Sequence, residues 1–410
     1  MQARRRVFAL TWFSYASYYF ARKNFPVAKA TIGRELSVGT AGLAAIDTGY
    51  LVTYAVGQFA GGWLGDRIGS RRLVGYGMLL SAGLICAFGA SSTAALFALF
   101  FGLNGFVQAT GWPGNVKAMA AWYGPTERGA VMGLWSTCFQ AGPLAATALA
   151  AFLLKRSGWR SAFFIPAVWV ALVGLAVLLF LQETPEKAPG ETAPPRAEAS
   201  AAARAAFRNP IVWLLGASYF GMKLIRYCID FWQPYYLEKG LGYAGDTAAY
   251  ASTAFQFGGI FGAIVVGHVS DRYFPERRGA VATVSTIALA GALALYAVVA
   301  PFGLWPNMLA MALVGFCLFG PDSLISGVAA QDLGGPLAAA TIAGFINGCG
   351  SVGAIAQGWV VAGVSERYGW QAVFRALMVL AAFSALALSA VWRLQRRSRP
   401  APALSPRGES

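Results

Sequence analysis

Residues 61–72 read GGWLGDRIGSRR, a short charged loop that lies between two long apolar stretches. A helix needs about 20 residues to cross a bilayer, because each residue rises about 1.5 Å. The flanking stretches, residues 43–65 and 72–92, are both long enough. A related triplet, Ser270-Asp271-Arg272, follows another apolar stretch at an offset of 205 residues from Gly65-Asp66-Arg67. The two loops indicate a chain built from two similar halves.

Twelve apolar stretches of this length occur along the chain. They cover residues 7–31, 43–65, 72–92, 94–122, 129–153, 160–182, 209–236, 247–270, 279–300, 305–331, 337–364 and 370–393. Residues 183–208 interrupt the series with four prolines and several charges, which is typical of a solvated linker. We therefore expect an all-α membrane protein of twelve transmembrane helices in two six-helix halves, 1–182 and 209–393, with a cytoplasmic tail at 394–410.

The composition excludes an ordinary soluble protein, because 57% of the residues are hydrophobic and only 12% are charged. The net charge of +15 does not predict nucleic-acid binding, since most basic residues lie in short loops between apolar stretches. With a cytoplasmic N-terminus, nineteen Lys and Arg residues fall on the cytoplasmic side and eight on the other. This asymmetry predicts a multi-pass protein of the inner (plasma) membrane with both termini and the linker in the cytoplasm.

Two further matches support an internal repeat. Pro113 is matched by Pro321 at an offset of 208, and Gly158-Trp159 by Gly369-Trp370 at an offset of 211. Three matches in the same order indicate two halves of the same topology, related by an axis along the membrane normal.

Charged residues inside the expected spans are the strongest functional signal, because each costs about 2.5–3.5 kcal/mol at the bilayer centre and so faces a cavity or a partner. They are Arg22, Lys23, Asp47, Lys117, Lys223, Arg226, Asp230 and Asp322, with a formal sum of +2. Arg22 and Arg226 are 204 residues apart, so the repeat places them at similar depth in the two halves. Two guanidinium groups facing one cavity suit a phosphate, whose oxygens match their paired donors.

Neighbouring residues extend this prediction. Helical spacing places Tyr15, Tyr18 and Tyr19 on the side of Arg22, where their hydroxyl groups or rings would line the cavity. Arg226 and Asp230 are four residues apart, which also fits a simple ion pair.

The other intramembrane carboxylates leave alternatives open. Asp47 is the carboxylate that could reach Arg22 or Lys23 from the next helix. Asp322 follows the helix-breaking Pro321 and fits a partner of Lys223 or Lys117, a proton carrier, or a polar residue at a kink.

The loop at 61–72 resembles the signature loop of the major facilitator superfamily. In that family the acidic and basic residues of the loop are thought to latch neighbouring cytoplasmic helix ends during alternating access. The resemblance implies that Asp66 and Arg67, together with Asp271 and Arg272, are gate residues. Lys117, near the cytoplasmic end of its helix, is expected to be a gate or topology charge.

A narrower resemblance is carried by four strings. They are Arg22-Lys23-Asn24-Phe25, Gly111-Trp112-Pro113, Glu127-Arg128-Gly129 and Arg226-Tyr227. They resemble the organophosphate:phosphate antiporters, which include glycerol-3-phosphate and hexose-6-phosphate transporters and sugar-phosphate translocases. The resemblance implies that Arg22 and Arg226 bind a phosphoryl group and that an organic phosphate is exchanged for inorganic phosphate.

Further candidates for substrate binding are Lys23, Lys223, Tyr18, Tyr19 and Phe139. Phe139 stands where the glycerol-phosphate carriers have a histidine, which argues against glycerol-3-phosphate as the cargo. We expect a monomer with small organic phosphates and the lipid bilayer as its partners.

Two other functions fit the sequence. One is a proton-coupled transporter of another solute, with Asp47, Asp230 or Asp322 as the proton carrier. The other is a sugar-phosphate sensor that signals to a partner kinase. The sequence does not predict an enzyme, a cofactor or a metal site, because it has no phosphate-cradling glycine loop, nucleophile elbow or metal-ligand cluster.

Overall fold

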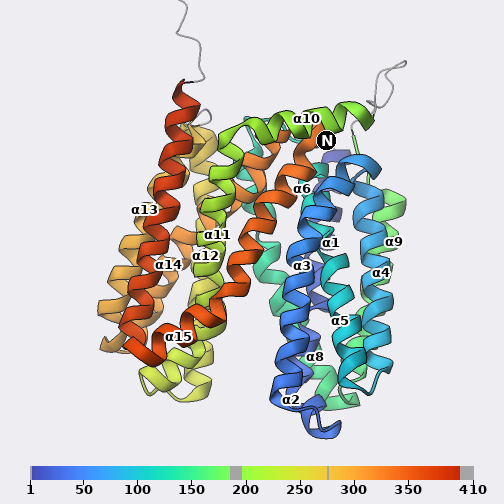
Figure 1. The fold of residues 1–410 in the computed structure, drawn as a ribbon, viewed down its shortest axis with the longest axis vertical. Coiled ribbons are helices and arrows are strands. Elements are labelled where there is room, and N and C mark those ends of the chain that lie inside the picture. The colour runs from blue at the N-terminus through green and yellow to red at the C-terminus, as the bar shows by residue number, and fades with distance from the viewer. Residues whose placement is uncertain (1, 185–195, 275–276, 398–410) are drawn as a thin grey trace, which may run out of the picture.

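The computed structural model describes residues 2–184, 196–274 and 277–397, and every regular element in them is helical. The first bundle consists of α1 (Gln2–Tyr18), η1 (Tyr19–Ala21), α2 (Asn24–Glu35), α3 (Thr40–Ile68), α4 (Ser70–Ala90), α5 (Ala94–Gln108), α6 (Gly111–Trp122), α7 (Arg128–Trp135), α8 (Cys138–Ser157) and α9 (Ser161–Phe180). The second consists of α11 (Pro210–Tyr235), η2 (Tyr236–Gly240), α12 (Gly245–Tyr273), α13 (Arg278–Val299), η3 (Ala300–Phe302), α14 (Leu304–Ser323), η4 (Leu324–Ala329) and α15 (Ala330–Arg397). Helix α10 (Arg196–Arg208) lies across one end of both bundles (Figure 1), which we call the α10 end.

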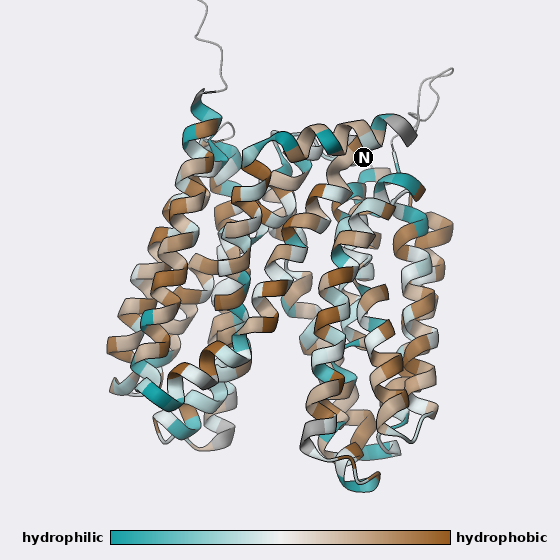
Figure 2. Ribbon diagram, viewed as in Figure 1, coloured by the Kyte–Doolittle hydropathy of each residue, from teal (hydrophilic) through white to brown (hydrophobic). Residues whose placement is uncertain are grey.

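Among the described residues, nine helical stretches are long and apolar enough to cross a membrane. The last two both lie within α15, whose backbone breaks at Gly335 and Gly369. The remaining expected spans, 7–31, 43–65 and 209–236, are also helical over most of their length but more polar, since they carry Arg22, Asp47 and Arg226. Hydrophilic residues gather at the two ends of the bundles, and hydrophobic ones predominate between them (Figure 2). The all-helical membrane fold predicted from the sequence is confirmed.

The first expected span, 7–31, is not one continuous helix. Helix α1 tightens into a 3₁₀ turn at Tyr19–Ala21, and Arg22 has non-helical angles (φ −126°, ψ −42°) before α2 begins. Pro26 explains the break, because its ring has no N–H and would clash with the carbonyl of Arg22 in a continuous helix. Arg22 therefore lies at an interruption of the helix rather than on its regular face.

Near the α10 end, helices of the two bundles pack closely against each other at glycine residues. A Cβ on Gly62 of α3 would lie 2.7 Å from the carbonyl oxygen of Ala340 in α15. A Cβ on Gly267 of α12 would lie 2.3 Å from the carbonyl oxygen of Gly129 in α7. Small residues allow this close helix contact. Towards the opposite end the ribbons of the two bundles diverge (Figure 1).

Candidate functional site

In the part of the chain that the structure describes, Arg22 is a cation without a carboxylate partner. Its Nε donates to Gln108 Oε1 at 3.1 Å, and its guanidinium carbon lies 4.7 Å from the ring centre of Tyr54 and 5.0 Å from that of Tyr19. Gln108 Oε1 also accepts from the Tyr50 hydroxyl at 2.8 Å, which fixes the acceptor in place. In the described part of the chain no carboxylate oxygen lies within 4.0 Å of Arg22.

Arg226 has two carboxylate neighbours instead. Its Nε lies 3.6 Å from Asp230 Oδ2, and its Nη1 lies 3.6 Å from Asp322 Oδ2. The ion pair of Arg226 and Asp230 predicted from their spacing is therefore present. The predicted pairing of Asp322 with Lys223 or Lys117 is corrected, because its ion-pair partner is Arg226. Asp322 follows Pro321 inside the last turn of α14, and its carboxylate is wholly buried next to Arg226 of α11.

Aromatic side chains from both bundles surround Arg226. Its guanidinium carbon lies 4.5 Å from the ring centre of Phe319 in α14. It lies 5.3 Å from that of Phe139, which comes from α8 of the other bundle. Phe139 is thus an apolar wall beside the second arginine, at the junction of the bundles.

Two lysines complete the cluster. Lys223 Nζ donates to Asn347 Oδ1 at 2.7 Å and to Ser351 Oγ at 2.9 Å, and it lies 5.8 Å from the ring centre of Tyr54 in the first bundle. Lys23 Nζ lies 5.9 Å from the ring centre of Phe231 in the second bundle. These contacts join the bundles around the same charged cluster.

The cluster has a formal charge of +2. Its cations are Arg22, Lys23, Lys223 and Arg226, and its carboxylates are Asp230 and Asp322. We call these six residues the central cluster. Such an arrangement attracts an anion, because buried charges of one sign in excess are stabilised by a counterion.

Two predicted site residues lie outside the central cluster. The Tyr18 hydroxyl bonds with the Val74 carbonyl oxygen and with Thr110 Oγ1 inside the first bundle, so we leave Tyr18 out of the site. Asp47 forms an ion pair with Lys29 and not with Arg22 or Lys23. The break at Arg22 places Lys29 on a separate helix that faces Asp47.

Asp66 lies at the contact between the bundles, near the α10 end. It accepts from the backbone N–H groups of Ala340 (3.2 Å) and Thr341 (2.7 Å) in α15, and Lys117 Nζ lies 3.1 Å from its Oδ1. A carboxylate is stabilised by the free N–H groups at the start of a helix. Asp66 therefore ties α3 and α6 of one bundle to the first turns after the Gly335 break in the other.

Asp271 makes the same contact in the opposite direction. It accepts from the backbone N–H groups of Gly129 (3.0 Å) and Ala130 (2.7 Å) at the start of α7. Its basic partner is Arg278, at 2.8 Å. Arg272, which the family resemblance implied as a gate residue, is exposed and forms no ion pair within the described residues.

Two charged residues at this end, Asp332 and Arg278, were not predicted as site residues, whereas Arg67 was. Asp332 lies 2.7 Å from Arg128 Nη1 and 3.7 Å from Arg278 Nη1, so it links the two bundles. Arg67 lies over the Trp63 ring at 3.4 Å and donates to Ser200 of α10 at 3.3 Å. Nothing in the local sequence marks Arg278 or Asp332, because their partners are distant along the chain.

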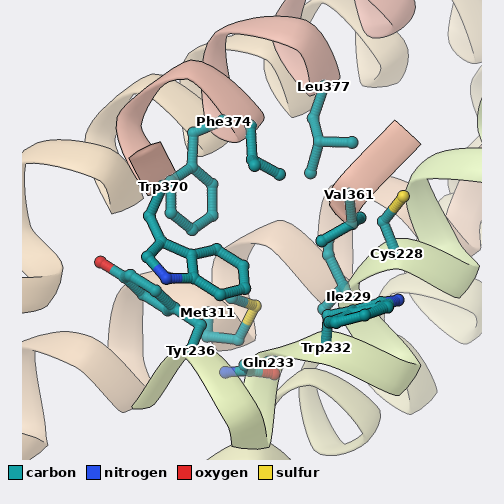
Figure 3. A pocket seen from close by; sticks show the side chains of 11 residues that line it. Cys228, Ile229, Trp232, Gln233, Tyr236, Met311, Val361, Trp370, Phe374 and Leu377 are labelled. Atoms are coloured by element: carbon teal, nitrogen blue, oxygen red, sulfur yellow. The ribbon is translucent and has the colours of Figure 1, made fainter. Parts of the chain in front are cut away.

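A pocket inside the second bundle is chemically different from the central cluster. Aromatic and aliphatic side chains, among them Tyr236, Met311, Trp370 and Phe374, surround it (Figure 3). No cation lines it. An anionic group would find no counterion there, so the central cluster is the better candidate site for an anion.

Comparisons with known proteins fit this geometry. The probable hexose phosphate transport protein of Chlamydia trachomatis is 28% identical, over 96% of this chain and 92% of that protein. The membrane sensor protein UhpC of Escherichia coli is 29% identical, over 94% of this chain and 91% of that protein. The solved structure of the proton:xylose symporter XylE shares the fold, with a TM-score of 0.75, 11% identity and coverage of 96% of each chain. The family model described as Major Facilitator Superfamily matches residues 11–358. The chain therefore belongs to the major facilitator superfamily, a family of transporters and not of enzymes, and is related to organophosphate transporters.

Proposed function

We propose that this protein moves an organic phosphate, such as a sugar phosphate, across the membrane in exchange for inorganic phosphate. The observation that carries the proposal is the central cluster, where four cations and two carboxylates meet between the bundles and Arg22 has no carboxylate partner among the described residues. Phosphate esters have a second pKa of about 6, so they are mainly dianions at neutral pH. A dianion offsets the formal charge of +2.

The arginines suit the phosphoryl group in particular. Each planar guanidinium offers paired donors that match two phosphate oxygens. Arg22 uses its Nε for Gln108, which leaves its terminal nitrogens for a ligand. The printed name of the Chlamydia relative, a hexose phosphate transport protein, supports the same class of substrate. Tyr19, Tyr54 and Phe139 would contact the organic part.

Electrostatics favours exchange over one-way transport. Two like charges about 8 Å apart repel by about 2 kcal/mol at an effective dielectric constant of about 20. Reorientation of the empty protein closes the central cluster away from water, and the repulsion between its cations raises the free energy of this step. A bound dianion removes that repulsion. In alternating access about a fixed central site, the loaded protein reorients more readily than the empty one.

Uptake of labelled phosphate into proteoliposomes tests the proposal. Vesicles preloaded with phosphate are expected to take up label at least about tenfold faster than empty vesicles, since about 1.4 kcal/mol of barrier difference corresponds to a factor of ten. Hexose phosphates should compete with the label, and the free hexoses should not. Equal uptake with and without internal phosphate, or abolition by an uncoupler, would favour the proton-coupled alternative.

A sensor is the second candidate, and the similarity to UhpC is the observation that favours it. A sensor would bind phosphate compounds through the same cations without carrying them across. Binding to the purified protein combined with no flux in the vesicles would identify this function.

We further propose that the α10 end faces the cytoplasm, because the nineteen basic residues assigned to that side outnumber the eight at the other. A protease-sensitive tag added after residue 410 should be cleaved in inside-out vesicles and protected in right-side-out vesicles. The reverse pattern would invert the orientation.

A further inference from the structure

We propose that Asp322, assisted by Asp230, is a built-in counterion of Arg226 that lets the empty transporter change conformation. This inference rests on the proposed phosphate exchange and assigns Asp322 a positioning role in it. It predicts that exchange is favoured but not strictly obligatory, and that the two carboxylates set the ratio of net transport to exchange.

The geometry around Arg226 is that of a loose ion cluster. Both carboxylates lie 3.6 Å from guanidinium nitrogens, which is beyond hydrogen-bonding distance. Arg226 Nε and both oxygens of Asp322 make no hydrogen bond within 3.5 Å, although all three atoms are buried. The carboxylates therefore neutralise Arg226 without occupying its donors, which remain available to a phosphoryl group.

The burial of Asp322 makes its role electrostatic. Its side chain is 1% exposed, against 20% for Asp230, whose Oδ1 also accepts from Gln256 Nε2 at 2.6 Å. A buried carboxylate is costly unless a cation lies close to it. Arg226 is the ion-pair partner of Asp322, and the Tyr219 hydroxyl and Lys223 also interact with this carboxylate. Arg226 and Asp322 therefore stabilise each other when no substrate is present.

The two arginines differ in their carboxylate neighbours. Among the described residues, Arg22 contacts the amide of Gln108 and tyrosine rings, whereas Arg226 has two carboxylates. Loss of the Asp322 charge would raise the formal charge of the empty central cluster from +2 to +3. With a dianion bound, the cluster would change only from 0 to +1. The empty protein is therefore penalised more than the loaded one.

The Asp322→Asn variant tests the inference in reconstituted vesicles. Two fluxes are compared in one preparation: efflux of labelled phosphate into phosphate-free buffer, and efflux into buffer that contains phosphate. Wild-type protein should show a measurable net efflux that is slower than exchange. The variant should lower the ratio of net efflux to exchange by about tenfold or more, because a buried charge is left without its counterion.

Three further variants control the result. Asp322→Glu keeps the charge and should restore much of the ratio, whereas Asp230→Asn should lower it by a smaller factor. Asp47→Asn removes a carboxylate that pairs with Lys29 away from the central cluster, so the ratio should not change. A second readout is equilibrium binding of inorganic phosphate, which Asp322→Asn should tighten because Arg226 no longer has that competitor.

The outcomes separate the two proposals. An unchanged flux ratio in Asp322→Asn and Asp230→Asn, together with unchanged phosphate affinity, would overturn the counterion role. If Asp322→Asn does not fold, the ratio in Asp230→Asn decides, because Asp230 is the more exposed carboxylate. Absence of any phosphate-dependent flux in the wild-type protein would instead contradict the proposed function.

Discussion

Replacing Arg22 with lysine is expected to lower the rate of phosphate exchange by about a hundredfold. A lysine keeps the positive charge but not the planar fork that pairs with two phosphate oxygens. It also cannot keep the guanidinium geometry between Gln108 Oε1 and the rings of Tyr19 and Tyr54. Hydrogen bonds to charged groups contribute about 1.5–3 kcal/mol each, so the loss of one or two accounts for this factor. The measurement is initial exchange in phosphate-loaded proteoliposomes.

Arg34→Lys is the matched control, since Arg34 is exposed at the end of α2, and its exchange rate should equal that of the wild type. The Arg226→Lys variant should also lose activity. Wild-type exchange in both Arg22→Lys and Arg226→Lys would remove the site proposed here.

Replacing Asp66 with alanine is expected to open the α10 end. The change removes the ion pair with Lys117 and the acceptor for the N–H groups of Ala340 and Thr341. Breaking a buried ion pair by removing one partner costs about 3–5 kcal/mol, which exceeds the roughly 2.7 kcal/mol that a hundredfold population shift requires. Alkylation of a cysteine introduced as Gln58→Cys reports the opening, because Gln58 is fully buried on α3 at the contact with α15.

The alkylation rate should rise by about a hundredfold in the Asp66→Ala background, after the five native cysteines have been replaced. Glu238→Ala is the control, since Glu238 forms an exposed ion pair with Lys239 and such pairs contribute little. An alkylation rate that is the same in all three backgrounds would show that Asp66 does not hold this end closed.

The sequence predicted the features that depend on local spacing and on the repeat. The helical spacing of Arg226 and Asp230 predicted their ion pair, and the repeated loops identified Asp66 and Asp271 as candidates. In the structure each of these two carboxylates accepts from backbone N–H groups of a helix in the other bundle. A sequence signal also existed for the break at Arg22, because Pro26 lies four residues later. It was outweighed by the apolar character of the whole stretch.

Tertiary pairings could not be predicted in the same way. The pairing of Asp322 with Arg226, and that of Asp332 with Arg128, join helices distant in sequence. Their geometry depends on how the helices rotate against one another, which no spacing rule specifies. Tyr18 shows the same limit, because its hydroxyl bonds with Val74 and Thr110, which are distant in sequence.

Displacement of labelled inorganic phosphate from the purified protein tests the central claim most directly, because it reports on the central cluster without depending on transport. A hexose 6-phosphate is expected to displace the label, and the same hexose without its phosphate should leave the label bound at the same concentration. Arg22→Lys should weaken binding of the label itself. Equal displacement by the phosphorylated and the free hexose, or phosphate binding that is unaffected by Arg22→Lys, would contradict the account.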